Sequence, residues 1–187
     1  SNQLASAGTP SDWASCQRAS PHKRLAPALT RLDLSSNALL GVPVELSDAC
    51  AVLSELRLRR NRIDCIDPFA APGSLGTTLY VLDLEENRLS HAPPWLPVAL
   101  PHLRTLLLAN NDVGPTLPPE WGFWESIQAM SLAGNPLRSL RQSVVAKGWP
   151  SVSACLRDRL PEGAARVVEP PRLQQPPPAS SDGYSGG

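Results

Sequence analysis

The sequence predicts an α/β fold of stacked units, with a curved parallel sheet on one face, an irregular proline-rich opposite face and a helical cap at the C-terminal side. A leucine pattern recurs five times, and an asparagine follows each strand-like segment at a nearly constant interval. After the last asparagine, the apolar residues change to helical spacing. The length of 187 residues suits one compact domain.

The repeated unit reads LxxLxLxxNxL and occupies residues 29–39, 53–63, 79–89, 103–113 and 127–137. All twenty apolar positions hold Leu, Ile, Val or Met, and the asparagines are 24, 26, 24 and 24 residues apart. Apolar residues two positions apart share one face of a strand, so stacked units bury them together and no unit folds alone. We expect each asparagine amide to bond to backbone groups that the turn would otherwise leave unpaired.

These units resemble the leucine-rich repeat superfamily. In residues 29–46, a proline and a further leucine follow the asparagine, as in the intracellular Ras-group-like branch of that superfamily. The resemblance covers residues 29 to about 162 and implies a leucine-rich repeat solenoid. It also implies a role in binding, because a fold of this kind seldom carries chemistry.

The segments after the third and fourth asparagines depart from this pattern, since they read PPWLPVALP and GPTLPPEWGFW. We expect extended, proline-rich backbone without helix on the convex side of these units. Trp95 and the aromatic residues of segment 121–124 are predicted to pack beneath that backbone. The alternative is that they are anchors for a partner, because tryptophan often dominates interface energetics.

Residues 138–162 are predicted to form a cap of two short helices over the last unit. Gly148 suits the end of the first helix, and Pro150 suits an early position of the second. A stacked fold exposes apolar side chains at its last unit unless something covers them. The polar face of the cap is predicted to carry Arg138, Arg141, Arg157 and Arg159.

The two ends of the chain lie outside the five repeats of residues 29–137. Residues 1–28 are predicted to be irregular, and Ser1-Asn2-Gln3-Leu4 matches either the end of a preceding unit or the remnant of a cleaved tag. An insertion carrying Trp13 and Cys16 would follow. Residues 163–187 form a proline-rich tail, which we expect to be disordered alone and extended where a partner holds it.

The concave face of the predicted sheet is the candidate partner-binding site. Outward residues at equal positions of adjacent strands lie about 4.8 Å apart and therefore form columns. Arginines of the second unit face acids of the third, and the later units offer small or apolar residues. Leu107 is either part of an interface patch or a scattered surface leucine. The predicted site comprises Arg57, Arg59, Arg60, Val81, Asp83, Glu85, Thr105, Leu107 and Ser131.

Several functions are not expected from the sequence. Lys+Arg and Asp+Glu are both 17, and acids flank the arginine cluster, so we do not expect nucleic-acid binding. There is no apolar run of roughly 20 residues for membrane insertion. The sequence has no phosphate-binding loop or nucleophile motif, and its 3 histidines are unrelated in position. We therefore expect no enzyme, small-molecule substrate, cofactor or metal.

Two non-enzymatic hypotheses remain, both in a reducing intracellular setting, which the scattered cysteines favour. In the favoured one, the chain is a structural subunit, or scaffold, of a large cytoplasmic assembly such as the axoneme of a cilium or flagellum. The incomplete first unit and the proline-rich tail suit such a complex. In the alternative, the chain is a soluble adaptor that recruits a small GTPase or another signalling protein through the concave face.

Overall fold

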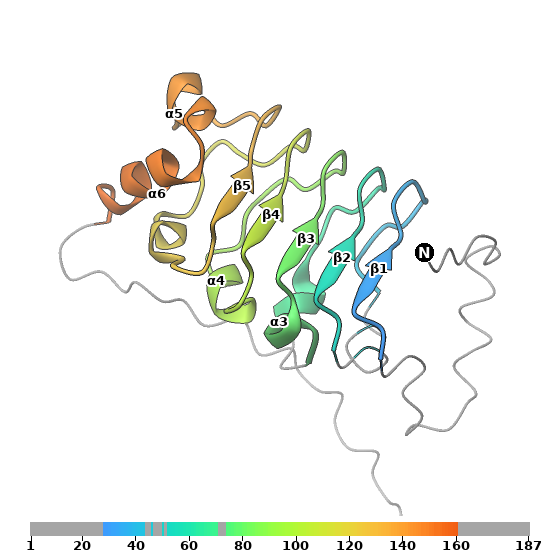
Figure 1. The fold of residues 1–187 in the computed structure, drawn as a ribbon. Coiled ribbons are helices and arrows are strands. Elements are labelled where there is room, and N and C mark those ends of the chain that lie inside the picture. The colour runs from blue at the N-terminus through green and yellow to red at the C-terminus, as the bar shows by residue number, and fades with distance from the viewer. Residues whose placement is uncertain (1–27, 44–45, 47–49, 51, 71–73, 161–187) are drawn as a thin grey trace, which may run out of the picture.

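The computed structural model describes residues 28–160, apart from 44–45, 47–49, 51 and 71–73. A five-stranded parallel sheet forms its centre, and the strands lie side by side in sequence order (Figure 1). Each strand is the three-residue segment around the second leucine position of one repeat. The strands are β1 (Arg31–Asp33), β2 (Glu55–Arg57), β3 (Val81–Asp83), β4 (Thr105–Leu107) and β5 (Ala129–Ser131).

The strands pair in the register that the repeat predicts. The central residue of each strand faces the centre of its neighbour, and in β2, β3 and β4 these leucines are 0% exposed. The first and third residues of each strand therefore point to the opposite face. In the first unit, Leu32 of β1 and Leu34, which follows the strand, are only half-buried, although the repeat predicts that both side chains are buried. Within the described residues, no strand packs against the outer side of β1.

One continuous cluster of buried apolar side chains extends from Val42 to Leu156. It includes the tryptophans whose role the sequence left open. Trp121 is 0% exposed and its indole Nε1 donates a hydrogen bond of 2.9 Å to the carbonyl of Pro93. Its ring meets that of Trp124 edge to face at 5.6 Å. Trp95 is buried as well, so these residues fill the core, as predicted, and are not exposed anchors.

The segments that return from one strand to the next contain short helices: the 3₁₀ helix η2 (Asp67–Ala70), α3 (Ser74–Thr78), α4 (Leu96–Ala99) and the 3₁₀ helix η3 (Pro119–Phe123). The prediction of helix-free, extended backbone in the third and fourth units is therefore wrong. Pro97 lies in the first turn of α4, and Pro119 begins η3. The prolines fit there because the first turn of a helix leaves its N–H groups without a partner in the helix.

Two helices follow the last strand, as predicted: α5 (Gln142–Ala146) and α6 (Trp149–Arg157). Gly148, with φ of 84°, separates them in a backbone conformation that favours glycine. α6 packs against η3, α5 and β5. At Gly122 in η3, an added Cβ would lie 2.9 Å from the carbonyl oxygen of Ser153, so only glycine permits this close approach. The four arginines expected on the polar face of this segment are exposed.

The predictions for the partial unit at residues 1–4, for Trp13 and Cys16, and for the proline-rich tail lie outside the described residues. Among the helices of the described segments, none is long and apolar enough to cross a lipid bilayer.

Candidate functional site

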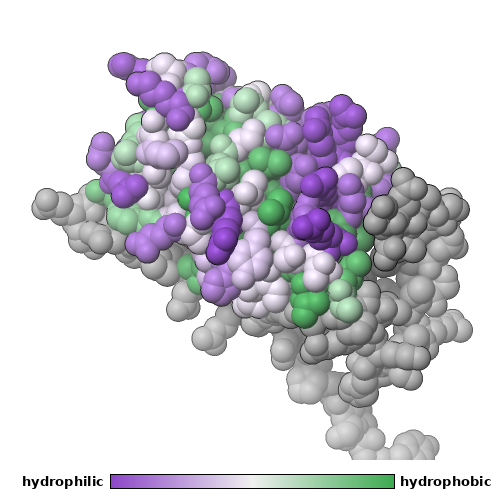
Figure 2. All heavy atoms as spheres, in the orientation of Figure 1, coloured by the Kyte–Doolittle hydropathy of each residue, from purple (hydrophilic) through white to green (hydrophobic). Residues whose placement is uncertain are grey.

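The nine predicted site residues lie on one side of the sheet. We call this side the open face: it consists of the first and third residues of each strand and of the outward residues in the turns that follow. The strand register places Arg57, Asp83 and Leu107 next to one another across β2, β3 and β4. Figure 2 shows apolar surface in the middle of this view, next to hydrophilic surface on the side of the early strands. The open face thus has a charged part and an apolar part.

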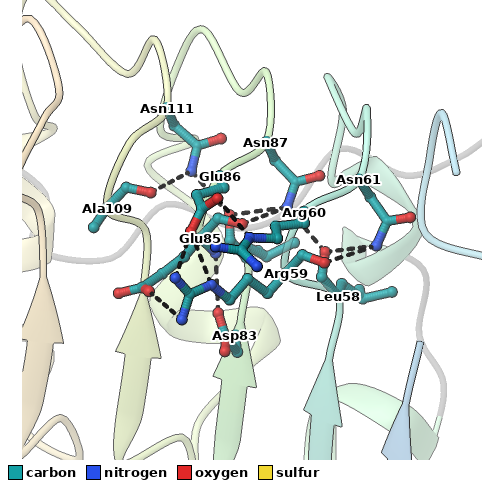
Figure 3. A network of polar contacts seen from close by, with 11 residues as sticks. Leu58, Arg59, Arg60, Asn61, Asp83, Glu85, Glu86, Asn87, Ala109 and Asn111 are labelled. Carbon is teal, nitrogen blue, oxygen red and sulfur yellow. Dashed lines mark hydrogen bonds and ion pairs between the residues drawn. The ribbon is translucent and has the colours of Figure 1, made fainter. Parts of the chain in front are cut away.

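The charged part joins the turn after β2 to the turn after β3 (Figure 3). Arg59 lies 3.6 Å from a carboxylate oxygen of Glu85 and donates through Nε to Glu86 at 3.0 Å. Arg60 donates through its own Nε to the other oxygen of Glu86 at 2.8 Å. A single glutamate therefore holds two arginines of the preceding unit. We call these four residues the charged cluster.

Glu55, which was not among the predicted site residues, neutralises two further arginines. Its carboxylate lies 3.2 Å from Nε of Arg31 and 2.6 Å from Nη2 of Arg57. Arg31 and Glu55 are direct partners in the strand register, so the column of first residues in the strands could have revealed the first of these pairs. Glu86 was likewise left out of the predicted site, although its column also contains Arg60. Arg31, Arg57, Arg59 and Arg60 therefore all have carboxylate partners within the chain.

Asp83 differs from its prediction as an exposed contact residue, because it is only 9% exposed. It lies in register between Arg57 and Leu107, whose longer side chains flank it. Its Oδ1 accepts a 3.0 Å hydrogen bond from the backbone N–H of Glu85. Asp83 therefore shapes the turn after its own strand and presents little of its charge to a partner.

In each turn after a strand, one residue has the left-handed backbone conformation, which the repeat pattern did not predict. Its φ is 59° at Ser36, 57° at Arg60, 55° at Glu86, 56° at Asn110 and 75° at Gly134. Glycine and asparagine adopt this region readily, whereas arginine and glutamate do so at a cost. Asn110 and Gly134 in this column could have indicated the left-handed conformation from the sequence. The same turn in consecutive units brings Arg60 and Glu86 together at one end of the open face.

The apolar part of the open face lies over β3 to β5. We call it the apolar patch, and it consists of Val81, Thr105, Leu107 and Ala129, with Ser131 at its border. Val81, Thr105 and Leu107 are half-buried and Ala129 is exposed, although the residues between them on the same strands point into the core. This arrangement offers a small apolar surface bordered by charged groups.

Two residues at the edge of the apolar patch were missed by sequence reasoning. Tyr80 and Arg104 immediately precede β3 and β4, outside the alternating positions used for the prediction. Tyr80 is 44% exposed, and the guanidinium carbon of Arg104 lies 5.3 Å from the centre of its ring. An arginine over an aromatic ring is stabilised by the negative face of that ring.

The described residues contain no group of three or more His, Cys, Asp or Glu side chains that could hold a metal ion. Cys50, Cys65 and Cys155 are free thiols. Burial raises the pKa of Cys50 and of Cys65, which favours the protonated, less reactive form. The chemical groups of the open face are therefore suited to ion pairing and apolar contact.

Acid is expected to remove the contribution of Glu86 to stability. Hydrogen bonds from Arg60 and then Arg59 lower the pKa of Glu86. A carboxylate with a lower pKa in the folded state stabilises the fold above its unfolded-state pKa and loses this effect as the pH falls through the folded-state pKa. We expect Glu86→Gln to lower Tm relative to the wild type at about pH 7 and to have a smaller effect at about pH 3.

Thermal unfolding followed by circular dichroism at both pH values measures this effect. Glu125→Gln, which removes an exposed carboxylate outside the charged cluster, is the matched control. An equal loss of Tm for Glu86→Gln at both pH values would contradict the role given to its charge.

Comparison with known proteins supports a relationship to leucine-rich repeat proteins. The chain is 33% identical over 99 residues to the leucine-rich repeat serine/threonine-protein kinase 1 of Caenorhabditis elegans, a match to 52% of this chain and 4% of that protein. It is 29% identical over 126 residues to the transforming growth factor beta activator LRRC33 of Danio rerio, a match to 63% of this chain and 18% of that protein. No family model matches the chain. The chain is thus similar to leucine-rich repeat proteins of which it matches less than a fifth.

Proposed function

We propose that this chain is a leucine-rich repeat solenoid of the Ras-group-like type and that it binds other proteins, without catalysis, through the open face of its sheet. The observation that carries the proposal is the apolar patch. Leu107 points away from the core although its neighbours Leu106 and Leu108 are 0% and 2% exposed. An apolar centre with a polar border is a common design of protein interfaces.

The internal pairing of the charged part supports the same proposal. Arg31, Arg57, Arg59 and Arg60 are already held by glutamates of the chain, so a partner gains little from them at the surface. Such pairs fix the shape and the pattern of charge around the apolar patch. The relationship to leucine-rich repeat proteins is in agreement with a binding role.

Two finer forms of this function are proposed. In one, the chain is a fixed subunit of a large intracellular assembly such as a ciliary axoneme, and in the other it is an adaptor for a small GTPase or another signalling protein. The sequence arguments for the fixed subunit rest on residues 1–4 and 163–187, which lie outside the described residues. The burial of Trp95, Trp121 and Trp124 removes them as anchors on the convex side, which favours the adaptor.

We expect Leu107→Glu and Val81→Arg each to abolish capture of the natural partner in a pull-down while leaving Tm unchanged. Both substitutions place a charge on the apolar patch and leave the core intact. Leu40→Glu is the matched control, because Leu40 is 68% exposed but lies in the return segment after Asn37, outside the open face. If both variants at the patch retain the partner, the open face is not the binding surface.

Crosslinking mass spectrometry in native lysate separates the two finer forms. An adaptor gives crosslinks to one soluble protein from residues around the open face. A fixed subunit gives crosslinks to several neighbours, from the convex side and from residues 163–187.

A further inference from the structure

We propose that Arg104 and Tyr80 form a carboxylate-recognition site next to the apolar patch, and that this face takes an extended peptide segment in which an acidic residue lies close to an apolar residue. The inference rests on the proposed function, because it names the chemistry of the partner at the same face.

Arg104, at the edge of the apolar patch, differs from the arginines of the open face in its partners. Arg31, Arg57, Arg59 and Arg60 pair with Glu55, Glu85 or Glu86 of the chain. Arg104 has no carboxylate partner among the described residues, and its guanidinium lies over the Tyr80 ring instead. A guanidinium held over a ring still has N–H groups that can donate to a carboxylate. The apolar patch is thus bordered by one positive charge that the described part of the chain does not neutralise.

The backbone fixes this pair in place. The carbonyl of Tyr80 accepts hydrogen bonds from the N–H groups of Arg104 and Thr105, at 2.9 and 3.0 Å. The carbonyl of Arg104 in turn accepts a 2.8 Å bond from the N–H of Gln128. The backbone of Arg104 therefore belongs to the ordered sheet region and does not need to be ordered when a partner binds. Such preorganisation reduces the cost of association.

The spacing of Arg104 and Leu107 indicates the form of the peptide. Leu107 lies three residues beyond Arg104, which precedes β4, and an extended chain rises about 3.3 Å per residue, so the two backbone positions are about 10 Å apart. In an extended peptide, side chains two residues apart share one face and lie about 7 Å apart, and the long arginine side chain can span the difference of about 3 Å. An apolar side chain over Leu107 and Val81 therefore places an acidic side chain, about two residues away, within reach of Arg104. A basic side chain there would meet the unpaired charge of Arg104 and be repelled.

A phage-displayed library of random peptides, selected on the 187-residue chain, tests the inference. We expect enriched peptides to carry Asp or Glu about two residues from Leu, Ile or Phe. Binding of a synthetic peptide of this type, followed by fluorescence anisotropy, should weaken about 10- to 100-fold with Arg104→Glu, because one charge-assisted bond is replaced by repulsion. Arg88→Glu is the matched control: Arg88 is exposed, also lacks a carboxylate partner among the described residues, and lies in the turn after β3 outside the open face.

The outcomes distinguish this inference from the proposed function. Loss of binding with Leu107→Arg, but not with Arg104→Glu, would overturn the carboxylate site and leave the apolar patch as the binding surface. Enriched peptides without acidic residues would likewise overturn the carboxylate site. Binding that survives both substitutions, or no enrichment over the empty support, would overturn both proposals. Selection of basic peptides by the Arg104→Glu variant would support the inference directly.

Discussion

Replacing Leu108 by alanine is expected to lower the free energy of unfolding by about 2–5 kcal/mol. Leu108 is 2% exposed and belongs to the inward column that also holds Leu84 and Leu132. Its backbone N–H donates a 2.9 Å hydrogen bond to Ser131 of the next unit, which fixes the position of its side chain between stacked units. The neighbouring units cannot close the space that alanine leaves, so both the transfer energy and a cavity energy are lost. Urea denaturation measures the difference.

Leu107→Ala is the matched control for this change, because the same residue type is truncated one position earlier. Leu107 is half-buried on the open face, and its loss is expected to change stability by about 0.5 kcal/mol or less. A similar loss for the two variants would mean that the inward and outward assignments of β4 are wrong.

The sheet could be predicted from the sequence because each strand repeats the same constraint. The second and third leucine positions of every unit must point inward together, and this fixes both the face and the register of β2, β3 and β4. The asparagines marked the end of each strand. The cap was predictable from Gly148 and Pro150, because both act through the backbone at a helix boundary.

The return segments were harder to predict. Proline density suggested extended backbone, yet Leu96–Ala99 and Pro119–Phe123 are short helices that accept proline in their first turn. What selects these turns is burial of a side chain in each: Leu96 and Trp121 are both 0% exposed. Such packing joins segments from different units, and no local pattern in one unit encodes it.

Only part of the site could be predicted from the sequence. The columns of the open face followed from the strand register, so Arg57, Asp83 and Leu107 were placed correctly as neighbours. The burial of Asp83 depends on the length of the flanking side chains, which a column does not describe. The left-handed turns bring Arg60 to Glu86, and Tyr80 and Arg104 meet just before their strands, where the alternation of the strand does not apply.

Replacing Asn111 by alanine is expected to cost about 1–3 kcal/mol, because it leaves one buried N–H group unpaired and removes one hydrogen bond from each of two carbonyls. Asn111 is 5% exposed. Its Nδ2 donates to the carbonyls of Leu84 and Leu108 at 2.9 and 3.0 Å, and its Oδ1 accepts from the N–H of Leu89 at 3.1 Å. Alanine leaves the N–H of Leu89 without this partner, in a place that water does not reach freely, while the two carbonyls keep their bonds from Asn87 and Asn135.

Asn37→Ala is the internal control, because Asn37 has the same position in the first repeat but a different environment. It is exposed, and within the described residues its Nδ2 donates to Leu34 and Ser35 of its own unit, at 2.8 and 3.2 Å. We expect a loss below about 1 kcal/mol for this variant in the same urea denaturation. Hydrogen exchange at the amide of Leu89 should also become faster in Asn111→Ala and remain unchanged in Asn37→Ala. Equal losses would show that the bonds of Asn111 to the preceding unit, which Asn37 lacks within the described residues, contribute nothing beyond the bonds within its own turn.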